Sequence, residues 1–289
     1  MHANGDMAHL SAESRFAGLG LRVVSALALM PPVLGAVYFG SPYFEILLGG
    51  CAVVMAWEWE RLCGGHTRQL DIFVLAATFV AAVFLTSLDR PSVALAVLLA
   101  GSASLIILAA PWRQTKASSD TEIGPGWRAA GALYIGACCV ALTWLRTGSA
   151  FGFETIVWLF ATVWAVDIGA YVCGRLIGGP RLAPAISPNK TIAGLLGGMA
   201  CAGAVGAIVA IFIDRQAIVL LAMSSVALGI VAQAGDVAES WVKRRRGLKD
   251  SSHLIPGHGG LLDRVDGLLA ATAATALFFA AKEGGVPTW

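Results

Sequence analysis

Acidic, basic and glycine residues gather in one stretch, Ser240–Asp266, which reads SWVKRRRGLKDSSHLIPGHGGLLDRVD. At its end Asp263 and Asp266 stand three residues apart, so they share a face if a helix begins there. Asp236, at the end of the preceding apolar block, would add a third carboxylate. Hard cations such as Mg²⁺ prefer sites made of oxygen ligands and usually share them with substrate phosphates. We therefore predict that these three acids hold a metal; an ordinary charged helix start is the alternative.

The same stretch carries positive charges and a glycine turn suited to anions. Glycines in PGHGG let backbone N–H groups approach an anion closely, and cations nearby would neutralise phosphates. The basic run alone is unspecific, because the positive-inside rule and attraction to anionic lipid explain most such runs. With the carboxylates beside it, the stretch predicts a phosphate site whose candidate residues are Lys243, Arg244, Lys249, Asp250, His258, Gly259, Gly260 and Arg264.

A second polar loop, residues 174–191, ends in SPNKT directly before an apolar block. Ser187, Lys190 and Thr191 would offer hydroxyls and an ammonium at a helix N-terminus, which favours anions; a simple helix cap is the alternative. Asp167 lies inside the apolar block before this loop. A carboxylate at the centre of a membrane helix costs about 2.5–3.5 kcal/mol, so we expect Asp167 to face a polar cavity, a cation or a metal.

The elements that must position these residues are membrane helices. Hydrophobic residues make up 57% of the chain and charged residues 13%, against roughly 25% charged in soluble domains. Apolar blocks of about 18–25 residues can each cross a bilayer core. We predict an all-α, polytopic integral membrane protein with about nine spans, near residues 19–39, 42–61, 70–88, 91–110, 129–146, 153–176, 194–213, 216–238 and 267–282.

The two halves of the chain differ in their loops. Residues 1–150 hold about five spans, and residues 151–289 hold the rest with the polar loops 174–191 and 240–266. A cytoplasmic N-terminus puts most of the 20 Lys and Arg residues, and both loops, on the cytoplasmic side. Glu58 and Glu60, in AWEWERL, are predicted to be interfacial anchors. The small residues of Gly194–Gly203 suggest close helix contact, and with it a possible homodimer.

The stretch Ser240–Asp266 resembles the signature of phosphatidate cytidylyltransferases, also called CDP-diacylglycerol synthases. The upstream segment DIGAYVCGRLIGGPRLAPAISPNKTIAG is similar to that family as well. One departure is that many members carry Trp-Glu where this chain has Ile192 and Ala193. The specific resemblance covers about residues 164–267, whereas the first five spans match only in general character.

The resemblance implies a reaction of CTP with phosphatidate that gives CDP-diacylglycerol and pyrophosphate and requires Mg²⁺. The family is thought to use two cations, one of which can be monovalent, such as K⁺. By position, Asp236, Asp263 and Asp266 would hold the metal centre, while the basic residues, with Asp167 and the SPNKT residues, would line the substrate cavity. The expected partners are CTP and membrane lipid, without nucleic acid. The expected location is a bacterial cytoplasmic (inner) membrane.

Three alternatives stay open on the sequence. A secondary transporter of a phosphorylated or anionic solute fits many spans with buried acids, but it predicts coupling residues near the bilayer midplane. A CDP-alcohol phosphotransferase would carry DGxxAR, and this chain lacks that arginine after DRVDG. A member of the same family that acts on a different lipid phosphate is not excluded, because recognition of the lipid's hydrocarbon chains is spread over apolar helix faces.

Overall fold

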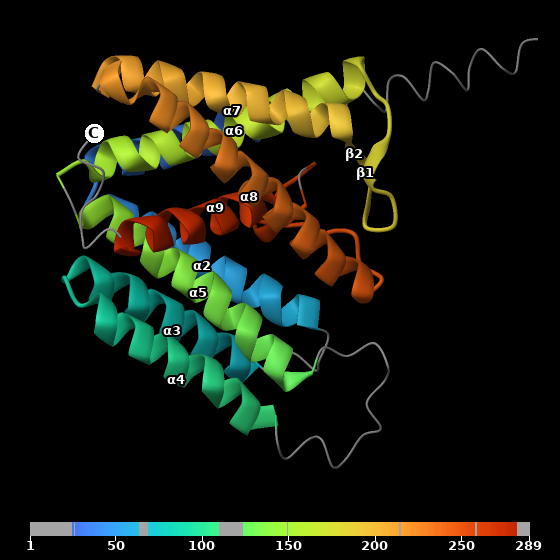
Figure 1. Cartoon of the computed structure of the whole chain (residues 1–289). Helices are drawn as coiled ribbons and strands as arrows, with labels where there is room; N and C mark the ends of the chain where they lie inside the picture. The colour runs from blue at the N-terminus through green and yellow to red at the C-terminus, as the bar shows by residue number, and fades with distance from the viewer. Residues whose placement is uncertain are drawn as a thin grey trace, which may run out of the picture.

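The computed structural model describes residues 25, 27–63, 69–109, 124–148, 150–213, 215–257 and 259–281. Almost all of its regular structure is helical, which confirms the predicted all-α class (Figure 1). A helix Leu27–Phe39 comes first. The elements that follow are α2 (Tyr43–Cys63), α3 (Gln69–Ser87), α4 (Pro91–Ala109), α5 (Pro125–Thr147), α6 (Gly152–Leu176), β1 (Arg181–Ala183), β2 (Ser187–Thr191), α7 (Ile192–Ile213), a 3-10 turn (Arg215–Ala217), α8 (Ile218–Arg245) and α9 (Leu262–Ala281).

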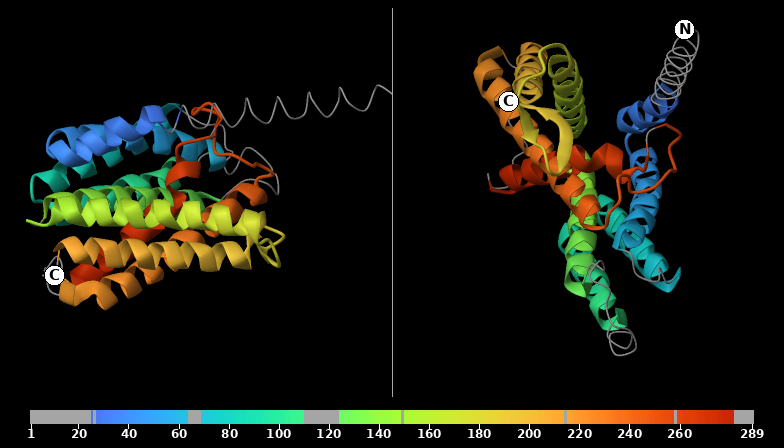
Figure 2. Two further views of the ribbon diagram at one scale, coloured as in Figure 1. Left: turned by 90° about the horizontal axis from the view of Figure 1, so that it is seen from above. Right: turned by 90° about the vertical axis from the view of Figure 1, so that its right-hand side faces the viewer.

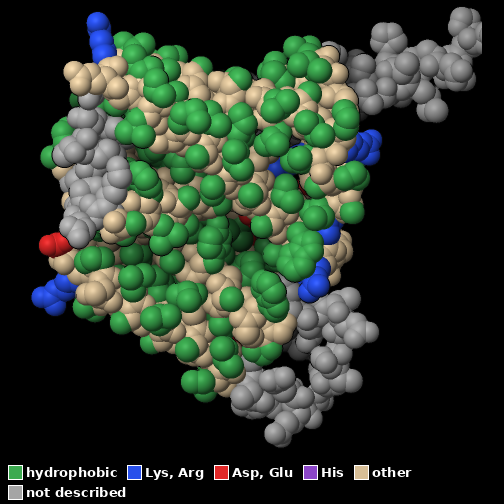
Figure 3. All heavy atoms as spheres, viewed as in Figure 1, with side chains coloured by type: hydrophobic (Ala, Val, Ile, Leu, Met, Phe, Trp, Pro, Cys, Tyr) green, Lys and Arg blue, Asp and Glu red, His purple; other side chains and the backbone are tan. Residues whose placement is uncertain are grey.

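Seven of the described helices, α3 to α9, are long and apolar enough to cross a membrane. Helix α2 has 21 residues but holds Glu45, Glu58 and Glu60, and the predicted first span is described only in part, over Leu27–Phe39. The face seen in Figure 3 is covered mainly by hydrophobic side chains, and most of the visible Lys and Arg side chains lie at its left and right edges. A chain with this pattern is an integral membrane protein with several spans.

Helix α9 lies between two groups of helices. Helices α6, α7 and α8 pack on one another in chain order, and α2 to α5 form the second group. Seen from the hairpin end, α9 crosses between these groups (Figure 2, right), and it contacts α8, α5, α6 and α2. The start of α9 therefore meets residues from both halves of the sequence.

Glycines bring α6 and α7 close together. A Cβ on Gly169 of α6 would lie 2.7 Å from Sγ of Cys201, and one on Gly198 of α7 would lie 2.9 Å from the carbonyl oxygen of Val166. Gly203 faces Val226 of α8 instead. The Gly194–Gly203 segment thus packs inside its own chain, so it no longer argues for the homodimer, which stays a prediction.

Both polar loops are more ordered than we predicted. Residues 181–191 form an antiparallel hairpin in which Arg181 pairs with Thr191 and Ala183 with Ser187. Helix α8 continues to Arg245, and α9 begins at Leu262, so the second loop spans about 246–261 and the predicted limits of 240–266 are wrong at both ends. Lys and Arg are good helix formers and suit a helix C-terminus, which explains the longer α8.

Candidate active site

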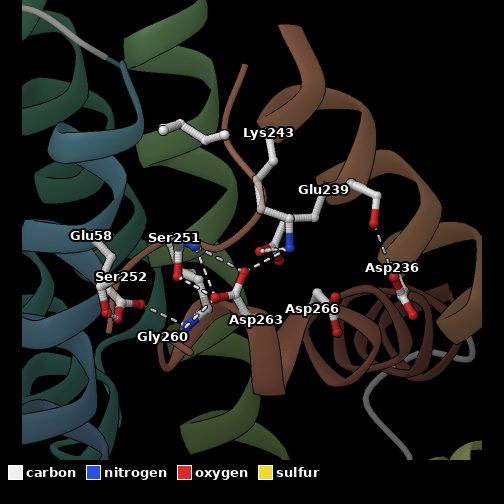
Figure 4. Close-up of polar contacts among 12 residues, drawn as sticks. Glu58, Asp236, Glu239, Lys243, Ser251, Ser252, Gly260, Asp263 and Asp266 are labelled. Carbon is white, nitrogen blue, oxygen red and sulfur yellow. Dashed lines mark hydrogen bonds and ion pairs between the residues drawn. The ribbon is translucent and has the colours of Figure 1, made fainter. Parts of the chain in front are cut away.

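Asp263, in the first turn of α9, is the centre of a network of hydrogen bonds (Figure 4). Lys243 donates from Nζ to Oδ1 of Asp263 at 2.7 Å and to Oε1 of Glu239 at 3.2 Å. Ser251 donates from its N–H to Oδ2 at 2.8 Å and from its hydroxyl at 3.0 Å, and the N–H of Gly260 donates to Oδ2 at 2.8 Å. Asp263 therefore ties α8, the loop and α9 together.

Asp266 follows one turn later and is much less bonded. Among the described residues, its one hydrogen bond comes from the N–H of Gly267, at 2.7 Å to Oδ1. The negative charges of Glu239 and Asp236 act on it. Asp236, Glu239 and Lys243 stand at i, i+3 and i+7 of α8, so they share the face that α9 approaches. Three carboxylates thus face one region, and one of them, Glu239, is absent from our predicted site.

The hairpin adds a cation to this acidic region. Lys190 of β2 lies with Nζ 2.7 Å from Oδ2 of Asp236, and also 3.4 Å from the backbone oxygen of Gln233. The charges of Asp236, Lys190 and Arg264 all act on Asp167 of α6. The structure therefore brings Lys190, Asp167 and Arg264 to the same region as the α8 acids, although they come from three further elements.

Other predicted residues have different surroundings. The hydroxyl of Thr191 accepts the N–H of Gly194 at 3.0 Å, so it caps α7, which is the alternative given above. Ser187 lies opposite Ala183 in the hairpin. Exposed Arg244 donates to the backbone oxygens of Ile186 and Leu248, at 3.3 Å each, and so ties the hairpin to the loop.

The loop itself holds the remaining predicted residues. Lys249 is exposed and Asp250 is partly exposed. Gly259 has a φ of 88°, in the left-handed region that favours glycine, and a Cβ there would lie 2.9 Å from Oδ2 of Asp263. A Cβ on Gly260 would lie 2.5 Å from Oε1 of Glu58. His258 lies outside the described residues.

Both predicted anchor residues of α2 are buried, so that prediction was wrong. Glu58 is 0% exposed, and its carboxylate accepts hydrogen bonds from the loop and from the start of α9. Glu60 is 1% exposed and pairs with Arg128 of α5, which also lies 3.1 Å from Asp71 of α3. No local pattern separates these acids from interfacial ones, because their partners lie far away in the sequence.

An apolar cavity of about 370 Å³ borders this region. It lies among the helix Leu27–Phe39, α2, α5, α6 and α9, and its lining includes Leu48, Cys51, Val163, Leu268 and Leu269. Among the described residues that line it, Asp167 and Arg264 are the charged ones. The cavity therefore joins an apolar space to the polar residues of the site.

Fold and site together define a polytopic membrane protein with acids and cations clustered where helices end. The chain belongs to the cytidylyltransferase family, whose model matches residues 20–281. It is 41% identical over 261 residues to a phosphatidate cytidylyltransferase of Brucella suis, covering 90% of this chain and 93% of that one. It is 34% identical over 278 residues to the enzyme of that name from Pseudomonas aeruginosa, covering 92% and 98%.

A third relative matches a shorter part of the chain at higher identity. The phosphatidate cytidylyltransferase of Staphylococcus haemolyticus is 45% identical over 119 residues, which cover 41% of this chain and 46% of that one. The family match confirms the resemblance given above, and it leaves the CDP-alcohol phosphotransferase alternative without support.

Proposed function

We propose that this protein transfers a cytidylyl group from CTP to phosphatidate and releases pyrophosphate. A lipid phosphate oxygen would form a bond to the α-phosphorus of CTP, while the bond from that phosphorus to the oxygen shared with the β-phosphorus breaks. No general base is required, because a phosphate monoester is already largely ionised at neutral pH. The observation that carries the proposal is Arg264, which lines an apolar cavity and also belongs to the charged region of Asp167 and Lys190.

The cations are proposed to bind phosphates. Lys190, Lys243 and Arg264 reach the acidic region from β2, α8 and α9, and positive charge there would stabilise charge on the transferring phosphoryl group. Exposed Lys249 and Arg244 would attract the nucleotide from solution. The backbone of Gly259 and Gly260 would shape the loop around it. The apolar cavity would take the acyl chains.

The donor set suits Mg²⁺, because it consists of carboxylates. Asp236, Asp266 and Glu239 would hold the ion, with the substrate phosphates completing its shell. Within the described residues no three such side chains already surround one point, so binding requires them to move closer. Asp263 would contribute an oxygen by exchanging one of its side-chain donors, which are Nζ of Lys243 and the hydroxyl of Ser251. A bound Mg²⁺ supplies charge stabilisation at the α-phosphorus; a second, monovalent ion such as K⁺ is compatible with the same acids.

The proposed location is a bacterial cytoplasmic (inner) membrane, with the N-terminus and both polar loops in the cytoplasm. The asymmetry of Lys and Arg among the loops supports this orientation. CTP would then reach the site from the cytoplasm and phosphatidate from the membrane. A transporter, the alternative, predicts acids near the midplane. Asp167 lies inside α6, whereas Asp263 lies in the first turn of α9 and Glu239 in the last two turns of α8.

The test is incorporation of α-labelled CTP into chloroform-soluble lipid by protein purified in detergent. Phosphatidate and Mg²⁺ are each supplied and withheld, and an Asp263→Asn variant is run beside the wild type. We expect labelled lipid only with both components and none in the variant. A folded wild-type protein that labels no lipid would overturn the substrate assignment. Label in an ether-linked lipid phosphate, but not in phosphatidate, would point to a related substrate.

A further inference from the structure

Two carboxylates hold the two ends of the loop between α8 and α9. These ends, Ser251–Ser252 and Gly260–Leu261, are called the neck of the loop below. Asp263 accepts hydrogen bonds from Ser251 and Gly260. Glu58 of α2 accepts them from the residues next in sequence to these two. The hydroxyl of Ser252 lies 2.6 Å from its Oε1, and the N–H of Leu261 lies 2.9 Å from the same atom. At each end of the loop, one residue donates to Asp263 and the next residue donates to Glu58 (Figure 4).

Glu58 also caps α9, the helix that carries Asp263 and Asp266. The N–H of Leu262, the first residue of α9, donates to Oε2 of Glu58 at 2.7 Å. The first N–H groups of a helix have no partner within it, and a carboxylate at that end satisfies them and suits the helix dipole. Such a cap normally comes from a residue next to the helix in the sequence, whereas here it comes from α2.

The neck is closely packed, and its serine side chains are buried. Glu58 is 0% exposed, and Ser251 and Ser252 are each 1% exposed. An added Cβ on Gly260 would collide with Oγ of Ser251 and lie 2.5 Å from Oε1 of Glu58. Three hydrogen-bond donors fix the position of the Glu58 carboxylate, which water does not reach. Because Ser252 and Leu261 adjoin Ser251 and Gly260 in the sequence, the same bonds hold the donors of Asp263 in place.

We infer that Glu58 is a positioning residue for the phosphate- and metal-binding site, an inference that rests on the proposed function. It touches neither the acids of α8 nor Lys243 through any contact of the described residues. It acts through Ser252, Leu261 and Leu262, which adjoin the donors to Asp263. Loss of Glu58 should loosen the Ser251–Gly260 neck, and Asp263 with it, so that catalysis falls without loss of the helical bundle.

The matched pair of variants is Glu58→Gln and Glu60→Gln. Both remove one buried charge from the same turn of α2, yet Glu60 contacts Arg128 and not the loop. An amide at position 58 replaces one accepting oxygen with a donor that faces other donors. Hydrogen–deuterium exchange in detergent, followed in peptides covering residues 249–262, reports the neck directly, and this readout needs no substrate.

For Glu58→Gln we expect exchange in these peptides to rise on the order of ten-fold. We also expect kcat to fall on the order of ten- to 100-fold with little change in the apparent KM for lipid, as for other outer-shell partners of a metal site. Glu60→Gln should lower the thermal midpoint while both readouts stay at wild-type values. Ser252→Ala, which removes one of three donors, should raise exchange less than Glu58→Gln.

Equal exchange in the two Gln variants, or wild-type exchange in Glu58→Gln, would overturn the inference. If Glu58→Gln does not fold, Ser252→Ala decides, and wild-type exchange in that variant is then the contrary result. If wild-type protein labels no lipid, the proposed function fails, and the exchange data still decide whether Glu58 holds the neck.

Discussion

Lys190 and Asp236 form an ion pair, with Nζ 2.7 Å from Oδ2, that joins the β1–β2 hairpin to α8. In the sequence the two residues lie on either side of the apolar helix α7. Its side chains remain partly exposed, 17% for Lys190 and 32% for Asp236, so a ligand can reach both. A phosphate would compete with Asp236 for the lysine, while a cation would compete with the lysine for Asp236.

Lys190→Ala should therefore lower kcat/KM for CTP on the order of 100-fold, because a cation positioned for developing phosphate charge is lost. Lys190→Arg should keep more activity, since the charge remains. The measurement is labelled-lipid formation over a range of CTP concentrations. Arg175→Ala is the control, because Arg175 is exposed and contacts Tyr171 on its own helix. Equal activity in Lys190→Ala and wild type would remove Lys190 from the site.

Glu239→Gln should raise the Mg²⁺ concentration needed for half-maximal activity on the order of ten-fold, as expected for a residue at a metal site. Glu239 faces the same region as Asp236 and Asp266, and Lys243 holds its carboxylate at 3.2 Å. The shift of the thermal midpoint on Mg²⁺ addition gives a second readout, because an ion that binds the folded state stabilises it. Glu154→Gln, in the first turn of α6, should match wild type in both. An unchanged Mg²⁺ dependence in Glu239→Gln would exclude Glu239 from the metal site.

Gly235→Val should strongly lower the rate of labelled-lipid formation and lower the thermal midpoint only slightly. A Cβ on Gly235 would collide with Ala270 of α9 and lie 3.0 Å from the backbone oxygen of Asp266. The larger side chain should move α9 away from α8 and separate Asp266 from Asp236. Gly50→Ala is the control, because an added Cβ there meets no atom within 4 Å, and a helix gains up to about 1 kcal/mol from that exchange. Full activity in Gly235→Val would show that the site tolerates a wider α8–α9 separation.

Arg128→Met should destabilise the fold by about 3–5 kcal/mol, since it leaves the buried carboxylates of Glu60 and Asp71 without their cation. The measurement is the thermal midpoint in detergent. Arg61→Ala removes an exposed arginine that lies over Trp57, and it should change the midpoint little. A midpoint for Arg128→Met equal to that of wild type would mean that the acids find other partners.

The features that follow from local spacing were predictable from the sequence. The hydrophobic blocks predicted the membrane helices, and i, i+3 spacing predicted that Asp263 and Asp266 share a face once α9 begins early. Sequence alone missed the hairpin, because two strands of 3 and 5 residues carry too few positions to show a period. It also missed the partners of Glu58 and Glu60, since pairing across helices leaves no trace in local hydrophobicity. Thr191 could be read either as a ligand or as a cap, and only its contact with Gly194 separates the two.

The hydrogen bonds of Glu58 also constrain the order in which the chain can assemble. Its partners Ser252, Leu261 and Leu262 follow it by 194, 203 and 204 residues. A ribosome therefore delivers α2 to the membrane long before those partners exist. During synthesis the carboxylate must find water or another partner, because an unpaired charge in hydrocarbon is costly. The buried surroundings of Glu58 are therefore complete only after α9 has been made, and they depend on both halves of the chain.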